Sequence, residues 1–241
     1  MDKKIIIIIT EGQTDKTALS LGLNSLFRDQ RIQFEFVVTG GDITSDYHSS
    51  PKNVLGKISF KVKKYMDLYS LCPEDLLLVA QITDADGAFI SEEAVEENED
   101  YSKTHYDSDR IITAKPVQII KRNERKKANI SKLVQEQHIT IGRVKIPYRI
   151  FYMSANLDHV LCNNANLSKE EKIQTARAFQ EQYGNFPEKF KEFFFSFLST
   201  VSEDYLSSWD YIQTGRHSLE RISNLGILIS HVKRSLNGLQ Q

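Results

Sequence analysis

Five consecutive isoleucines, Ile5–Ile9, form the first hydrophobic run of the chain and lead directly into the polar turn 10–15. A second aliphatic run occupies 76–82 and ends in the acidic segment 83–87. Both runs are continuous rather than alternating, and both are too short to span a membrane. These properties are typical of strands that are buried on both faces of a parallel sheet. We therefore expect the rest of the chain to be arranged around a sheet that contains both runs.

The order of elements over the first 83 residues indicates an α/β fold. Apolar residues recur at helical spacing in 15–30 and again in 54–70, and a strand is expected between them at Phe34–Val38. Strand, helix and strand in this order normally form a right-handed crossover between parallel strands. Functional groups of such sheets gather just beyond the carboxyl ends of the strands, and the polar loop 42–53 is expected near that site.

The second half of the chain carries weaker patterns. We expect a short fourth strand at Arg110–Ala114, a further strand at Arg149–Met153, and a helix start or an exposed loop in the acidic stretch 91–109. Helical patterns follow at 172–183, 186–200 and 217–236. The first of these helices is preceded by a capping box formed by Ser168 and Glu171.

Composition excludes several classes of protein. The chain of 241 residues is 40% hydrophobic and 26% charged, which is ordinary for a globular protein, and its net charge of −1 produces no strong field toward nucleic acid or membranes. No apolar stretch approaches the length of a membrane span, and no signal peptide is visible. The two cysteines match no metal or redox spacing. We therefore expect a soluble cytoplasmic protein with no membrane partner.

Acidic residues follow the two buried strands. Asp84 and Asp86 are separated by one residue, so in an extended backbone both carboxylates project to the same face and can reach one ion. Mg²⁺ (or Mn²⁺) prefers such oxygen ligands, and the bound ion would orient a phosphate and lower the pKa of a bound water. Glu11, after the first strand, would complete the coordination or act as a general acid or base. The alternative is that these acids cap the helices that follow the strands.

The three strand ends resemble those of the Toprim fold. The matching motifs are Glu-Gly-Gln-Thr-Asp at 11–15, Gly-Gly-Asp at 40–42 and Thr-Asp-Ala-Asp-Gly at 83–87. Topoisomerases, bacterial primases, small RNA-maturing nucleases and OLD-family nucleases share this fold, and the resemblance covers about residues 3–115. It implies a Toprim-like α/β domain over 1–160, with a parallel-sheet core flanked by helices. Residues 161–241 would be a helical extension packed on the same core.

The resemblance also implies roles for individual acids. Glu11 corresponds to the catalytic glutamate of the family, and Asp84 and Asp86 correspond to its metal-binding pair. Asp15 occupies an additional acidic position that OLD-like members use, and it is the candidate ligand for a second metal. The nuclease would use Mg²⁺ (or Mn²⁺) as its cofactor.

A later segment, 151–159, is similar to a strand and acid-bearing turn in RloB-like and AbiL-like proteins, which are Toprim-related components of restriction and abortive-infection loci. Asn156 stands where an acid is expected, and Asp158 is the candidate substitute. His159 is either a metal ligand or a helix cap. The sequence contains no P-loop, so any ATPase would be a separate chain.

Basic residues supply candidates for contacts with a nucleic-acid backbone. A cluster within 118–137 contains Lys121, Arg122, Arg125, Lys126 and Lys127. Each could contact a phosphate, and the alternative is a solvated helix face in which Glu124 is a partner. Lys115, after the fourth expected strand, is a candidate for a phosphate near the metal or else an ordinary surface lysine. His48 is a candidate general base or a solvated loop residue.

Two functions of different classes are consistent with these patterns. The preferred hypothesis is a Mg²⁺-dependent Toprim-fold nuclease that hydrolyses phosphodiester bonds of DNA or RNA in phage defence or abortive infection. The alternative is a non-catalytic Toprim scaffold, in a homo- or hetero-oligomer, that binds or inhibits a separate ATPase or effector. Its interface would include surface aromatics of 186–211 and the acidic stretch 91–109, although the phenylalanines of 186–197 are expected mainly in the core. A phosphotransferase acting on nucleotides is a third hypothesis.

Overall fold

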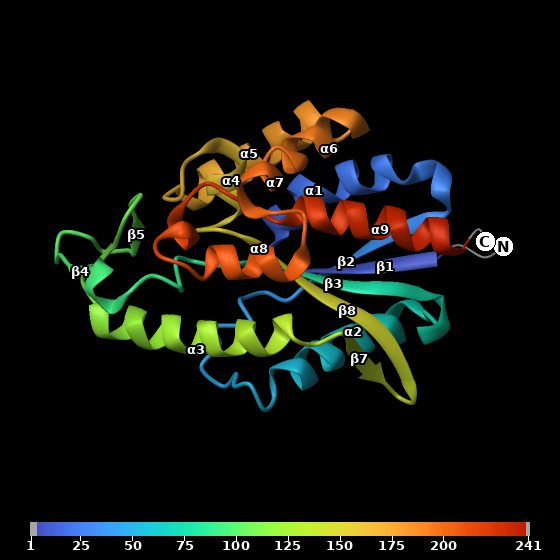
Figure 1. The fold of residues 1–241 in the computed structure, drawn as a ribbon, viewed down its shortest axis with the longest axis horizontal. Coiled ribbons are helices and arrows are strands. Elements are labelled where there is room, and N and C mark those ends of the chain that lie inside the picture. The colour runs from blue at the N-terminus through green and yellow to red at the C-terminus, as the bar shows by residue number, and fades with distance from the viewer. Residues whose placement is uncertain (1–3, 240–241) are drawn as a thin grey trace.

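The fold is taken from a computed structural model that describes the backbone of residues 4–239 and the side chains of residues 4–236. A five-stranded sheet with the order β2-β1-β3-β8-β7 forms its centre (Figure 1). Its strands are β1 (Lys4–Thr10), β2 (Ile32–Val38), β3 (Leu76–Asp84), β7 (His138–Ile141) and β8 (Val144–Met153). All pairs are parallel except β7 with β8. The prediction of an α/β fold with a mainly parallel sheet is confirmed.

Helices cover both faces of this sheet. Figure 1 shows α2 (Val54–Tyr69) and α3 (Pro116–Val134) on one side, and α1 (Gln13–Leu26) and the C-terminal helices on the other. The C-terminal helices are α4 (Leu157–Cys162), α5 (Lys169–Tyr183), α6 (Pro187–Phe195), α7 (Leu198–Val201), α8 (Tyr205–Ile212) and α9 (Leu225–Leu239). Short 3₁₀ turns lie at Arg28–Gln30, Pro73–Asp75, Glu92–Ala94 and His217–Leu219.

The isoleucine run occupies the middle of the sheet. Ile6–Ile9 are at most 1% exposed, because β1 has a hydrogen-bonded strand on each side and helices above and below it. The register pairs Ile9 with Gln81. Glu11, two residues further along, therefore comes level with Thr83 at the end of β3, and this register brings the two acidic strand ends together.

The C-terminal helices share the core of the sheet. One continuous cluster of buried residues contains the isoleucines of β1 together with Phe190 and Phe194 of α6 and Trp209 of α8. Phe190 and Phe194 are fully buried, which agrees with the core role expected for the phenylalanine-rich segment, whereas Phe186 is half exposed. The capping box of Ser168 and Glu171 begins α5, as the sequence predicts.

The expected fourth strand of the main sheet is in a different sheet. β6 (Ile111–Thr113) lies between β4 (Val95–Glu97) and β5 (His105–Tyr106) in a separate three-stranded sheet. Its Ile111 packs into a small cluster that also contains Ile90 and Leu219. The place beside β3 is taken by β8 instead. The stretch 91–109 therefore contains two short strands and a 3₁₀ turn, where a helix start or a loop was expected.

Two boundaries also differ from the sequence prediction. β8 begins at Val144 rather than at 149, because its first residues pair with β7 in a hairpin that turns at Gly142, with φ 62°. The helix expected at 217–236 begins only at Leu225. The segment before it contains the 3₁₀ turn His217–Leu219 and Ser223, which forms an isolated antiparallel bridge with Met153. In the described part of the chain, no helix is long and apolar enough to cross a membrane.

Candidate functional site

Acidic residues from adjacent strands meet beyond the carboxyl ends of the parallel strands. Glu11 follows β1, Asp42 follows β2 and Asp84 ends β3. Oε1 of Glu11 accepts a hydrogen bond from Thr83 Oγ1 at 2.8 Å and another from the backbone N–H of Asp84 at 3.1 Å. Glu11 is therefore hydrogen-bonded directly to the end of β3, the neighbouring strand.

Asp84 connects the end of β3 to the start of α4, the helix that follows β8. Its Oδ1 accepts a hydrogen bond from the backbone N–H of Leu157, the first residue of α4, at 2.9 Å. Among the described residues, neither Oε2 of Glu11 nor Oδ2 of Asp84 accepts a hydrogen bond. Each side chain thus has one carboxylate oxygen that remains available for a ligand.

The pKa values of both acids are raised. Desolvation and then the negative charge of Asp42 raise the pKa of Glu11 to about 8. Desolvation and the nearby Glu11 raise the pKa of Asp84 well above its ordinary value. Two poorly solvated carboxylates that repel each other make a site that attracts either a proton or a cation.

Asp86 has a different environment from the one that the sequence indicated. β3 ends at Asp84, and Asp86 lies in a turn with φ 51°, followed by Gly87 with φ 63°. The strand alternation that was expected to aim Asp84 and Asp86 at one ion therefore does not extend to Asp86. Its Oδ2 forms an ion pair with Lys126, and its Oδ1 accepts a hydrogen bond from the hydroxyl of Tyr106 at 3.2 Å.

Lys126 is the central cation of the site. Its side chain is fully buried, and its ammonium group forms ion pairs with Asp86 and, at 2.9 Å, with Asp42. Arg122, one helical turn earlier on α3, donates one hydrogen bond to the backbone oxygen of Asp86 and one to the hydroxyl of Tyr106, both at 2.9 Å. Two residues of the predicted basic cluster thus stabilise the acids from inside the protein.

The other predicted basic residues lie elsewhere. Lys121 and Lys127 are exposed on the outer side of α3, as a solvated helix face would place them. Arg125 is half-buried and donates a hydrogen bond to the backbone oxygen of Ser45 at 2.8 Å. Lys115 is exposed at the N-terminus of α3 and is not next to a strand of the main sheet. Of the basic residues on α3, Arg122 and Lys126 therefore contact the acids of the site, whereas Lys121 and Lys127 face the solvent.

A second group of charges surrounds the start of α1 and α4. Asp15 accepts a hydrogen bond from the backbone N–H of Gly12 at 2.8 Å and so caps α1. Asp158 is buried and forms an ion pair with Lys172 of α5 at 2.7 Å. Desolvation chiefly raises the pKa of Asp15, and the charge of Asp158 contributes to the same shift. Asp158 is therefore close enough to take part in the electrostatics of the acid cluster.

The two candidate histidines do not join the acids. Asn156 Oδ1, rather than His159, caps α4 by accepting a hydrogen bond from the backbone N–H of His159 at 2.9 Å. The ring nitrogen Nδ1 of His159 is buried without a hydrogen-bond partner, and desolvation lowers the pKa of this ring. His48 is exposed in the polar loop after β2.

A cavity of about 520 Å³ opens over Asp84 and Asp86. Its walls include Lys103, His105, Tyr106 and Lys172. Figure 1 shows the small sheet, which contributes part of this wall, beyond the carboxyl ends of the main strands. A polar ligand can therefore reach the acids between the small sheet and the start of α5.

The acids of the site form a small donor set for a divalent metal. Within residues 4–239, no group of three or more Asp, Glu, His or Cys side chains is arranged so that it could hold an ion by itself. Mg²⁺ commonly uses only one or two protein carboxylates and takes its other ligands from water and substrate phosphates. Glu11 and Asp84, each with an available oxygen and a raised pKa, fit that smaller donor set.

Sequence reasoning missed three members of the site. Asp42 was noted only as the end of the Gly-Gly-Asp motif, and its position after a strand, like that of Glu11, was the signal that could have identified its role at the site. Tyr106 and Lys172 reach the cavity from distant segments, and no local pattern marks them.

Comparisons of the chain with protein-family models, with curated proteins and with solved structures give no match. The function is therefore inferred from the side chains of the site.

Proposed function

We propose that this chain is a Mg²⁺- or Mn²⁺-dependent, Toprim-fold nuclease that hydrolyses phosphodiester bonds of DNA or RNA. One observation carries the proposal: Glu11 and Asp84 lie together at the ends of two central parallel strands, each with a raised pKa and an available carboxylate oxygen. Acids with perturbed pKa values beside a cavity, which Asp84 lines here, are typical of catalytic sites.

Glu11 and Asp84 would hold the metal, which would polarise the phosphate and lower the pKa of an attacking water when bound. The carboxylate of Asp86 could bind the metal only if its ion pair with Lys126 were broken. The main role of Asp86 would therefore be to position Lys126 and Tyr106. A glutamate with a pKa of about 8 exchanges its proton near neutral pH, as a general acid or base must. As the alternative to holding the metal, Glu11 is therefore suited to protonate the leaving oxygen or to accept a proton from water.

The basic residues would reduce the repulsion between the site and a phosphate. Lys126 and Arg122 offset the charges of Asp42 and Asp86 inside the protein. Lys103 and Lys172 line the cavity and would contact the substrate backbone directly. The likeness of 151–159 to RloB-like and AbiL-like proteins supports a role in phage defence, with any ATPase on a separate chain.

A second candidate function is a non-catalytic Toprim scaffold for such a partner. It is favoured by the structural use of several acids, because Asp15 caps α1 and Lys126 pairs with both Asp42 and Asp86. Exposed apolar side chains on α2, chiefly Phe60 and Leu68, would then belong to the interface. The expected interface within 186–211 is weaker, since Phe190 and Phe194 are in the core and Phe193, Phe195 and Phe197 are partly buried against it.

Cleavage assays separate the two candidates. Single- and double-stranded DNA and RNA are incubated with Mg²⁺ or Mn²⁺ and with the wild type, Glu11→Gln, Asp84→Asn or the exposed control Glu97→Gln. The nuclease proposal expects metal-dependent cutting that falls by about 10²–10⁴-fold in Glu11→Gln and persists in Glu97→Gln. If the wild type cuts none of these substrates and binds neither metal by calorimetry, the scaffold function replaces the nuclease.

A further inference from the structure

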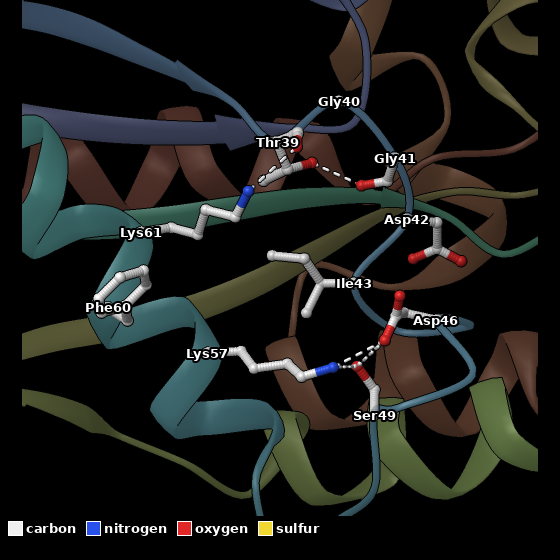
Figure 2. A pocket seen from close by; sticks show the side chains of 10 residues that line it. All are labelled: Thr39, Gly40, Gly41, Asp42, Ile43, Asp46, Ser49, Lys57, Phe60 and Lys61. Atoms are coloured by element: carbon white, nitrogen blue, oxygen red, sulfur yellow. Dashed lines mark hydrogen bonds and ion pairs between the residues drawn. The ribbon is translucent and has the colours of Figure 1, made fainter.

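A second cavity, of about 380 Å³, lies between α2 and the loop that follows β2. Figure 2 shows Lys57 and Lys61 extending from α2 toward this loop, which carries Gly40, Gly41 and Asp42. Phe60 lines the cavity from the same helix. Asp42 joins the cavity to the acid cluster, because Lys126 pairs with Asp42 on one side and with Asp86 on the other. The cavity is therefore next to the proposed catalytic site.

Its charges leave one lysine without a carboxylate partner. Lys57 forms an ion pair with Asp46 at 2.7 Å, and Asp42 is neutralised by Lys126. Lys61 donates only to the backbone oxygen of Thr39, at 3.2 Å, and forms no ion pair within the described chain. The ammonium group of Lys61 therefore retains a positive charge and further N–H donors that an anion could use.

The loop after β2 exposes its backbone at Gly40 and Gly41. Gly40 and Gly41 have φ values of 74° and 156°, and no atom from beyond the adjacent residues lies within 4 Å of the place where a Cβ would stand at either position. A ligand can consequently approach this backbone closely. Gly40 also donates its backbone N–H to the carbonyl oxygen of Glu11 at 3.1 Å, which couples the loop to the acid cluster.

Phe60 supplies the apolar part of the cavity. This apolar ring is 66% exposed. On the same helix, Phe60 follows Lys57 by three residues and directly precedes Lys61. An exposed ring beside lysines is the combination that proteins use to stack nucleobases while they bind the backbone phosphate.

We propose that this cavity binds a nucleoside phosphate unit, with the base stacked on Phe60 and the phosphate on Lys61 beside the Gly40–Gly41 backbone. In the nuclease, on whose proposed function this role rests, the cavity is a subsite for the strand that is cut at Glu11 and Asp84. The same chemistry is present in a free nucleotide and in a single strand of DNA or RNA, and the experiment distinguishes these two sources.

The test measures binding in EDTA, so that no cleavage occurs. Fluorescence anisotropy follows a short labelled single strand of DNA or RNA, and adenosine 5′-monophosphate serves as the competitor. The variants are Phe60→Ala and Lys61→Met, and the matched controls on α2 are Leu68→Ala and Lys63→Met. Leu68 is 73% exposed and Lys63 pairs with Asp67, and neither lines the cavity.

The expected results differ for the two variants. Phe60→Ala weakens binding by about 5- to 150-fold, the range for losing one stacked base. Affinity falls as salt rises, and Lys61→Met makes the slope of log affinity against log salt shallower by about 0.7, as for one lost phosphate contact on a single strand. The controls leave both quantities unchanged. Binding of adenosine 5′-monophosphate itself, measured by calorimetry, without binding of the strand identifies a free nucleotide as the ligand of the cavity.

Cleavage assays with the same variants separate failure of the subsite from failure of the nuclease. If the wild type cuts but Phe60→Ala and Lys61→Met bind and cut as well as it does, the subsite is overturned and the nuclease stands. If strand binding depends on Phe60 and Lys61 but nothing is cut, the cavity stands as a binding site without the nuclease. Absence of binding by the wild type to both the strand and the mononucleotide overturns the subsite.

Discussion

Nζ of Lys126 lies 2.9 Å from Oδ2 of Asp42, and the Lys126 side chain has no solvent-exposed surface. The same ammonium group pairs with Asp86. Burial acts to raise the pKa of Asp42, but the charge of Lys126, together with hydrogen bonds from Ser45 and Thr44, outweighs it and lowers the pKa to about 2. α3 thus contributes an internal cation that allows acids from two strand ends to remain charged inside the protein.

Replacing Lys126 by methionine should strongly destabilise the fold. Lys126→Met keeps most of the side-chain volume but leaves the carboxylates of Asp42 and Asp86 without their buried counter-ion. We expect a loss of about 3–5 kcal/mol in the free energy of unfolding, measured by urea denaturation at pH 7. The exposed neighbour Lys127→Met should change it by no more than about 0.5 kcal/mol. Equal stability of the two variants would contradict the structural role of the buried pair.

Glu11 should make the metal-free protein less stable as pH rises. The pKa of Glu11 is about 8 in the fold and 4.5 as an ordinary glutamate, so between these values the folded state binds more protons than the unfolded state. Its contribution to stability is therefore fully present below about pH 4.5 and is lost as pH rises to about 8.

Urea denaturation across this pH range in EDTA measures the effect. Glu11→Gln removes the titrating group, so its stability relative to the wild type should increase from pH 5 to about pH 8. The exposed acid Glu99 provides the control, and Glu99→Gln should run parallel to the wild type. A constant difference between wild type and Glu11→Gln at all pH values would refute the raised pKa.

Divalent metal should stabilise the protein through Glu11 and Asp84. A ligand present at a hundred times its Kd raises the free energy of unfolding by about 2.7 kcal/mol if it binds only the folded state. We expect Mn²⁺ to do this at pH 8, and to bind more weakly at pH 6, where protons compete for Glu11. Asp84→Asn should abolish the effect, whereas the exposed Asp67→Asn should retain it. An equal thermal shift in both variants would place the metal elsewhere.

Two helical glycines should respond to alanine with opposite signs. A Cβ on Gly22 of α1 would overlap the ring of the buried Phe190 of α6, so Gly22→Ala should cost about 1–3 kcal/mol. Gly56 of α2 has open space around it, and Gly56→Ala should stabilise the fold by about 0.5–1 kcal/mol because alanine favours the helix. Chemical denaturation of both variants measures the difference. A stable Gly22→Ala would show that α1 and α6 are not in close contact.

Patterns within short segments were sufficient to predict β1, β3 and the cap of α5. A continuous aliphatic run needs burial on both faces wherever it lies, and a serine three residues before a glutamate satisfies the first turn of a helix by local hydrogen bonds. The strand expected at Arg110–Ala114 does form, but no local pattern could predict which sheet it joins. The segment Ile111–Thr113 has strand character, but only its contacts with Ile90 and Leu219 assign it to the small sheet.

The sequence by itself determined that Glu11 and Asp84 would each lie at the end of a buried strand, since the composition and length of each aliphatic run are local properties. Only the tertiary structure decided what those acids face. Lys126 is separated by 84 residues from Asp42 and by 40 from Asp86, and it looks like any other member of a basic helix in the sequence. Its burial depends on which face of α3 packs against the sheet, because a lysine leaves water only where carboxylates from distant segments replace its hydration.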